Sequence, residues 1–130
     1  MQAHLIFYVQ DQQLSKTFYQ RVLGLEPSLD VDGMTEFCLG EACVLGVMPI
    51  SGIKRLLGAA LPDPAQCGRI PKAELYLCVD NAASYHAKAL QNGATELSKL
   101  QKRDWGHLVA YSLDPDGHVL AFAETYAGSD

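Results

Sequence analysis

The sequence predicts an α+β fold made of two tandem βαβββ modules, and two observations lead to this fold class. First, a strand-like run followed by a capped helix pattern occurs twice: Gly24 lies 13 residues after Asp11, and Gly93 lies 13 residues after Asp80. Self-similarity of this kind indicates a duplicated structural unit. Second, each copy continues into three segments with strand character, which gives each half the order βαβββ.

The first module begins with residues 4–9, an apolar run with β-branched and aromatic residues that is typical of a strand. Asp11 is the expected N-cap of the next helix, and Gly24 is expected to end it in a left-handed conformation. One apolar stripe runs along this helix at every fourth residue: Leu14, Phe18 and Val22. Three strands are predicted to follow, at residues 26–31, 35–39 and 42–48.

The second module repeats this order, beginning with a strand at residues 74–79. Asp80 is the expected helix cap and Gly93 the expected stop. The apolar stripe of this helix is predicted from Ala83, Ala87 and Leu90. Three strands are predicted at residues 95–97, 108–113 and 118–124, the last two joined by the turn sequence Asp-Pro-Asp-Gly at residues 114–117.

We expect residues 1–130 to form a single domain, with module one at 3–49, a connector at 50–71 and module two at 72–124. The connector contains three prolines and is long for a link inside a compact domain. A short helix is predicted near residues 53–57, with Lys54 and Arg55 exposed on the connector.

The composition limits the classes of function. The chain has 130 residues, a formal net charge of −5 and 48% hydrophobic residues, which is too apolar for a disordered chain. An acidic chain without a basic cluster is a poor nucleic-acid binder, so we expect no nucleic-acid partner. The longest apolar run, residues 44–50, is far shorter than the roughly 20 residues of a membrane-spanning helix.

No secretion signal is evident at the N-terminus, so a cytoplasmic location is expected. The four cysteines show no C-x-x-C spacing and are expected to be reduced core residues.

Three stretches of the sequence resemble the vicinal oxygen chelate superfamily, which includes glyoxalase I, extradiol dioxygenases, and fosfomycin- and bleomycin-resistance proteins. They are Phe-Tyr…Val-Leu-Gly-Leu at 18–25, Glu-Leu-Tyr-Leu-Cys-Val-Asp at 74–80, and Asp-Trp-Gly…Asp-Pro-Asp-Gly-His-Val-Leu-Ala-Phe at 104–122. The last stretch is most similar to the metal-free, bleomycin-resistance-like branch. The resemblance implies two curved mixed sheets that form a cup around a cavity, and a homodimer.

In the enzymes of this superfamily, the first and last strands of each module supply four metal ligands. By strand alignment, the resemblance places these positions at His4, Gly46, Glu74 and Ala121. Glycine and alanine offer no side-chain donor, whereas a catalytic divalent site generally needs about three protein ligands. We therefore expect no cofactor, and a divalent metal held by His4 and Glu74 is the alternative. A register error of one residue would instead bring Met48, Glu41 or Glu124 toward the site.

Strand alternation and the resemblance together predict the residues that face the cavity. The predicted ligand-binding residues are His4, Ile6, Tyr8, Glu74, Tyr76, Trp105 and Tyr111.

Several of these residues have alternative interpretations. Tyr8 and Tyr76 could simply fill the cup. Glu74 could pair with His4, receive the positive group of a ligand, or act as a catalytic base. Trp105 could stack on a ligand, contact a second copy of the chain or anchor its loop. His107 is a further ligand candidate, whereas His86 and His118 are expected to be solvated.

The sequence is compatible with three functions. The first is a metal-free binding protein that sequesters a cationic or amphipathic small molecule, such as a bleomycin-type or aminoglycoside-type antibiotic. The second is a glyoxalase-like lyase or isomerase, or a dioxygenase, with an atypical site in which His4 and Glu74 are the catalytic candidates. A binding domain for another metabolite is a third possibility.

Overall fold

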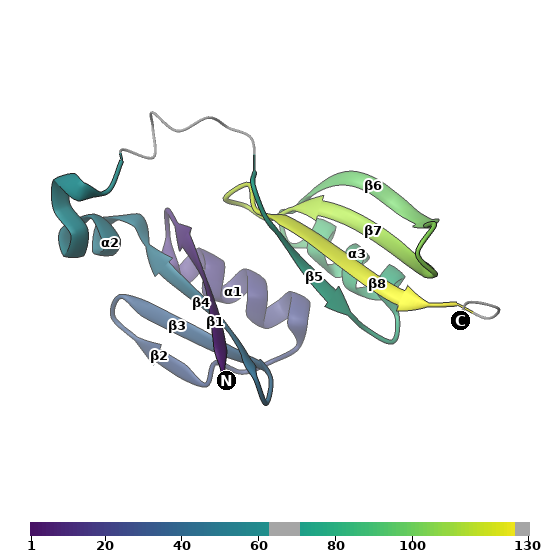
Figure 1. Ribbon diagram of the computed structural model, residues 1–130, viewed down its shortest axis with the longest axis horizontal. Coiled ribbons are helices and arrows are strands. Elements are labelled where there is room, and N and C mark those ends of the chain that lie inside the picture. Colours follow the sequence, from purple (N-terminus) through teal and green to yellow (C-terminus); the bar gives the residue numbers. More distant parts are fainter. Residues whose placement is uncertain (63–70, 127–130) are drawn as a thin grey trace. The chain divides into compact units, whose positions relative to one another are not determined.

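The computed structural model describes residues 1–62 and 71–126, and it confirms the predicted α+β fold with two tandem modules (Figure 1). The chain divides into two compact units, Met1–Ile70 and Pro71–Asp130. Each unit contains a four-stranded mixed sheet with a helix on one face. We call the opposite face of each sheet its front face.

The first unit has the strand order β1-β4-β3-β2, in which β1 is parallel to β4 and the other pairs are antiparallel. Its elements are β1 (Ala3–Val9), α1 (Gln12–Leu23), β2 (Leu29–Val31), β3 (Met34–Gly40), β4 (Cys43–Pro49), α2 (Ile50–Leu57) and the 3₁₀ helix η1 (Gly58–Ala60). The predicted helix in the connector therefore exists, but it begins directly after β4.

The second unit has the equivalent order β5-β8-β7-β6, with β5 parallel to β8. Its elements are β5 (Glu74–Cys78), α3 (Ala82–Gln91), β6 (Thr95–Lys102), β7 (His107–Leu113) and β8 (Val119–Thr125). Strand β6 is much longer than the sequence predicted, and β2 in the first unit is shorter.

Helix α1 begins and ends where the sequence predicts. The Asp11 side chain accepts a hydrogen bond from the backbone N–H of Leu14, and Gly24 adopts a left-handed conformation with φ of 67°. The buried face differs from the prediction, because Leu14 is exposed. The buried residues of α1 are Ser15, Phe18, Tyr19 and Val22. Tyr19 packs edge-on against Phe18, with ring centroids 4.9 Å apart.

The predicted cap and stripe of helix α3 are both wrong by one residue. Asn81, not Asp80, accepts the capping hydrogen bond, from the backbone N–H of Ser84. Both side chains can cap a helix equally well, so sequence preference does not separate two adjacent candidates. The buried stripe is Ala82, His86 and Ala89, one residue earlier than predicted, and the predicted Ala83 and Ala87 are exposed.

His86 and His118 are not simply solvated. His86 is only 7% exposed, and its Nε2 lies 3.0 Å from Oε2 of Glu96. His118 is half-buried, and its Nδ1 lies 2.8 Å from Oδ2 of Asp114. Asp114 also accepts hydrogen bonds from the backbone N–H groups of Asp116 and His118, so it organises the predicted turn between β7 and β8.

The cysteines also differ from the prediction. Cys38 and Cys78 are exposed and Cys43 is half-buried, all as free thiols, while Cys67 lies outside the described residues. In the part of the chain that the structure describes, no helix is both long and apolar enough to cross a membrane.

Candidate functional site

The front face of the first unit carries three of the predicted site residues, all on β1. Phe7 and Val9 are buried, Leu5 is half-buried, and Phe7 lies beside Tyr19 of α1, whereas His4, Ile6 and Tyr8 alternate with them and are exposed. The prediction from strand alternation therefore places these three residues on one face. Ile6 is 38% exposed and Tyr8 is 43% exposed within the described structure.

His4 has a carboxylate partner within its own unit. Its Nδ1 lies 3.3 Å from Oε2 of Glu36 on β3, and its Nε2 lies 3.1 Å from Oε1 of Gln2. Glu36 reaches the front face because it pairs with Gly46, which in turn pairs with Ile6. Sequence reasoning missed Glu36, although alternation along β3 places it on the same face as His4 once the strand order is known.

The two last-strand positions of the family's metal site do not fit a metal. Gly46 pairs with Ile6 and Ala121 pairs with Tyr76, so both lie on front faces as the alignment predicts. A Cβ atom at Gly46 would lie 3.1 Å from Sδ of Met34 and 3.2 Å from Cγ1 of Ile6, so a ligating side chain there would displace its neighbours. Ala121 is fully buried. We assign no chemical step to a metal at these positions.

The front face of the second unit carries a group of aromatic residues. Tyr76 on β5 and Tyr111 on β7 both pair with Ala121 on the intervening strand. The two rings pack against three small or branched residues: Val109, Ala121 and Ala123. Small side chains on β8 thus leave space that the rings fill. We call Tyr76, Trp105, His107 and Tyr111 the aromatic cluster.

A tight turn between β6 and β7 brings Trp105 to this cluster. The backbone N–H of Arg103 donates to the carbonyl of His107 at 2.8 Å, and that of Gly106 donates to the carbonyl of Arg103 at 3.3 Å. Gly106 has a φ of 89°, which favours glycine. The turn places Trp105 at its tip, where it is 56% exposed.

Hydrogen bonds hold three members of the aromatic cluster together. The indole Nε1–H of Trp105 donates to the hydroxyl oxygen of Tyr76 at 2.9 Å. The same oxygen lies 2.6 Å from Nδ1 of His107. Because indole is only a donor, the Tyr76 oxygen must accept from it, which leaves the Tyr76 O–H free to donate to Nδ1 of His107. Trp105 is therefore exposed but held in a fixed position.

Arg103 is a further component that sequence reasoning missed. Its guanidinium carbon lies 5.2 Å from the ring centroid of Tyr111, within the range of a cation–π contact. Its Nη2 donates to Oγ of Ser98 at 2.7 Å and to the carbonyl of Val109 at 3.1 Å. The sequence signal was weak, since one arginine before the Asp-Trp-Gly motif is typical of any exposed turn.

The electrostatics of Tyr111 connect Glu74 to the cluster. Burial raises the pKa of the Tyr111 hydroxyl above its usual value, and the negative charge of Glu74 raises this pKa further. The guanidinium of Arg103 acts in the opposite direction. Glu74 itself is exposed at the first position of β5. The structure thus brings together Tyr76, Trp105 and Tyr111, with Glu74 close enough to influence Tyr111.

The chain belongs to the Glyoxalase/Bleomycin resistance protein/Dioxygenase superfamily, whose family model matches residues 2–122. No curated relative matches it.

Solved structures show the same fold. A glyoxalase-related enzyme from Fulvimarina pelagi has a TM-score of 0.80 and 19% identity, covering 100% of this chain and 95% of that one. A glyoxalase/bleomycin resistance protein/dioxygenase family enzyme from Burkholderia phytofirmans PsJN has a TM-score of 0.79 and 18% identity, with coverages of 95% and 97%. TioX from Micromonospora sp. ML1 has a TM-score of 0.68 and 15% identity, with coverages of 97% and 99%. At these identities the likeness concerns the fold alone.

Proposed function

We propose that this protein binds a cationic or amphipathic small molecule and acts by sequestration, without a metal. The aromatic cluster is the binding surface, and Glu74 receives the positive group of the ligand. Bleomycin-type and aminoglycoside-type antibiotics are the compounds to test first. No bond is made or broken in this function, because binding alone lowers the free concentration of the compound.

The observation that carries this proposal is the exposed but hydrogen-bonded Trp105. An indole fixed by Tyr76 loses little freedom when a planar ligand stacks on it, and this lowers the entropic cost of binding. Tyr111 and Tyr76 add apolar contact area beside it. Arg103 lies against Tyr111 and would repel a cation there, so the ligand's charge belongs on the Glu74 side of the cluster.

Trp105 is the only tryptophan of the chain, so its fluorescence reports on this surface alone. We expect bleomycin, added in the presence of a chelator, to change Trp105 emission in a saturable manner. Glu74→Gln should weaken binding about fivefold, the effect of losing a partly exposed ion pair of about 1 kcal/mol. Glu41→Gln, which removes the same charge from the turn between β3 and β4, is the matched control. No saturable change at millimolar ligand, for bleomycin and an aminoglycoside alike, would contradict the proposal.

We further propose that the protein acts in the cytoplasm as a homodimer. Sedimentation velocity at micromolar concentration tests the assembly, and a mass of one chain would refute the dimer. Cell fractionation tests the location, which is wrong if the protein is found in the culture medium or with membranes.

A second candidate function is metal-free acid–base catalysis of the lyase or isomerase type, with His4 and Glu74 as the reacting groups. One observation favours it: the Glu36 carboxylate lies beside Nδ1 of His4, an arrangement that orients an imidazole for proton transfer. Turnover of a candidate substrate that is lost in both His4→Gln and Glu74→Gln would support this function. Stoichiometric metal in protein purified without chelators would instead favour the metal-dependent alternative.

A further inference from the structure

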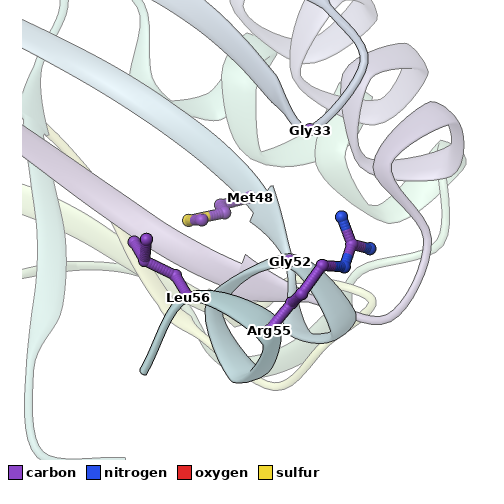
Figure 2. Close-up of a pocket in the computed structure, with 5 residues that line it drawn as sticks. All are labelled: Gly33, Met48, Gly52, Arg55 and Leu56. Atoms are coloured by element: carbon purple, nitrogen blue, oxygen red, sulfur yellow. The ribbon is translucent and has the colours of Figure 1, made fainter. Parts of the chain in front are cut away.

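The first unit contains a pocket that lies outside the aromatic cluster. It has a volume of about 350 Å³ and lies between the turn that joins β2 to β3 and helix α2 (Figure 2). Its lining residues are Gly33, Met48, Gly52, Arg55 and Leu56. The volume is at the lower end of the range of about 300–1,000 Å³ that is usual for small-molecule sites.

The pocket combines apolar walls with a cation. Figure 2 shows the side chains of Met48 and Leu56 on one side and the guanidinium of Arg55 on the other. Leu56 is 72% exposed, so its apolar surface is available to a ligand. Among the described residues, no carboxylate forms an ion pair with Arg55, and its guanidinium can therefore bind an external anion.

Hydrogen bonds fix the rim of the pocket opposite α2. The side-chain amide of Gln12 accepts from the backbone N–H of Gly33 at 3.0 Å. The same amide donates to the carbonyl of Val31 at 2.8 Å and to Oγ1 of Thr35 at 3.0 Å. One side chain of α1 thus holds both ends of the turn. A rim that is ordered before binding reduces the entropy lost when a ligand enters.

We propose that this pocket binds a small carboxylate with an apolar body of about six to ten carbon atoms, the size that such a volume accommodates. The guanidinium of Arg55 pairs with the carboxylate, whose two oxygens match its parallel N–H groups. Met48 and Leu56 enclose the apolar body, and the flexible thioether of Met48 adapts to its shape. This ligand has the opposite charge to the one proposed for the aromatic cluster.

Octanoate is the probe for this site, and the methyl group of Met48 is the reporter. The chain has three methionines, so ¹³C-methyl labelling gives three resonances, and Met48→Leu identifies the one required. We expect octanoate to shift the Met48 resonance in a saturable manner. Octanol, which lacks the charge, should bind about tenfold more weakly, and octylamine should not shift the resonance. Equal shifts with all three compounds, or none with octanoate, would overturn the proposal.

Matched variants separate the charge from the shape of the pocket. Arg55→Gln should weaken octanoate binding about tenfold, whereas Lys54→Gln removes the same charge from the same helix at a position that does not line the pocket. Equal losses of octanoate affinity in these two variants would mean that only the overall charge of the protein matters, and this would refute the site.

Gly52→Leu should abolish binding by filling the pocket. A Cβ atom at this position makes only ordinary contacts, 3.6 Å from Pro49 and 3.7 Å from Met48, so the backbone accommodates it. Circular dichroism verifies that this variant folds. If it does not, the comparison of Arg55→Gln with Lys54→Gln decides. Full octanoate affinity in folded Gly52→Leu protein would contradict the assignment.

Discussion

The two units have the same topology and different front faces. In both, the first strand is parallel to the last, and a residue on the first strand lies beside a small residue on the last: Ile6 beside Gly46, and Tyr76 beside Ala121. Ile6 remains exposed, whereas Tyr76 is half-buried against the core of its unit, and Trp105 and His107 form hydrogen bonds with its hydroxyl. The duplicated backbone therefore supplies a scaffold, while a few side chains determine what each face can bind.

The difference arises in the turn between the second and third strands along the chain of each unit. These strands are β2 and β3 in the first unit and β6 and β7 in the second. In the second unit, β6 is extended and the turn after it delivers Arg103 and Trp105 to the front face. In the first unit, β2 has only three residues and its turn ends at Gly33, which has no side chain. The first unit therefore forms its pocket with α2, whereas the second forms an aromatic surface with its own turn.

The largest expected effect is a loss in the free energy of unfolding when a core phenylalanine of either unit is replaced. Comparing the two losses tests whether the two cores contribute equally to stability. Phe37 in the first unit and Phe122 in the second are both fully buried. Phe37→Ala and Phe122→Ala should each lower the free energy of unfolding by about 3–5 kcal/mol through lost burial and a cavity. Urea denaturation followed by circular dichroism measures the loss for both units, and Trp105 fluorescence follows the second. A loss below about 1 kcal/mol in either variant would show that the corresponding core is not tightly packed.

A smaller loss in the free energy of unfolding is expected when a tyrosine hydroxyl group is removed from a front face. Tyr76→Phe removes the group that joins Trp105 to His107 and should cost about 1–2 kcal/mol of stability. It should also free the indole, lowering Trp105 fluorescence anisotropy. The matched control is Tyr8→Phe, since the described structure shows no hydrogen bond of the Tyr8 hydroxyl. Its cost should stay within about 0.5 kcal/mol. Unchanged anisotropy in Tyr76→Phe would mean that the hydrogen bond does not hold Trp105.

The fold could be predicted from the sequence because local signals and the repeat agree. Asp11 and Gly24 delimit α1 as expected, and alternation along residues 4–9 places Phe7 inside and Tyr8 outside. The errors occur where local chemistry is ambiguous. Asp80 and Asn81 are adjacent residues with equal capping ability. The stripe of α3 is ambiguous for a similar reason, because alanines occupy both Ala82 and Ala83 and only packing against the sheet decides which of them is buried.

The candidate site could be predicted only in part. Tyr76 and Tyr111 follow from alternation, because neighbouring strands bring them to one face. The contributions of Arg103 and Glu36 depend on long-range register and on turn geometry, and no local pattern encodes these. A residue such as Glu36 becomes a partner of His4 only when β3 is known to lie two strands away from β1.

The charged neighbours of Tyr111 should control the ionisation of its hydroxyl. Because burial and Glu74 raise its pKa while Arg103 lowers it, Glu74→Gln should move the pKa back toward the usual value of about 10, and Arg103→Gln should raise it. NMR of ¹³C-labelled tyrosine rings, with Tyr111→Phe for assignment, measures the titration. Glu41→Gln should have no effect on it, and a shift as large as that of Glu74→Gln would exclude a specific influence of Glu74.

The raised pKa of Tyr111 also determines how the free energy of unfolding changes with pH. The unfolded chain ionises this hydroxyl at a lower pH than the folded protein does. The stabilisation that depends on neutral Tyr111 is therefore fully present below the pKa that this hydroxyl has in the unfolded chain. It is lost as the pH rises through the pKa in the folded protein. We expect the free energy of unfolding to fall above pH of about 10 less steeply in Tyr111→Phe than in the parent. Identical slopes would contradict this linkage.

The smallest effect is expected in the hairpin of the first unit. The side chain of Lys16 donates to Asp30, and the hydroxyl of Thr35 also donates to it at 2.9 Å. The hydrogen bond from Lys16, followed by that from Thr35, lowers the pKa of Asp30 below its usual value. The stabilisation from ionised Asp30 is therefore present above the unfolded pKa and is lost as the pH falls through the folded pKa.

Asp30→Asn should consequently destabilise the protein slightly at neutral pH, and the difference from the parent should vanish in acid. Urea denaturation at a series of pH values measures it, with Asp32→Asn in the same hairpin as the control. Because Asp30 belongs to the first unit, Trp105 emission of the folded variant should equal that of the parent. A destabilisation that persists at acidic pH would mean that the substitution acts on the conformation of the turn rather than on the charge of Asp30.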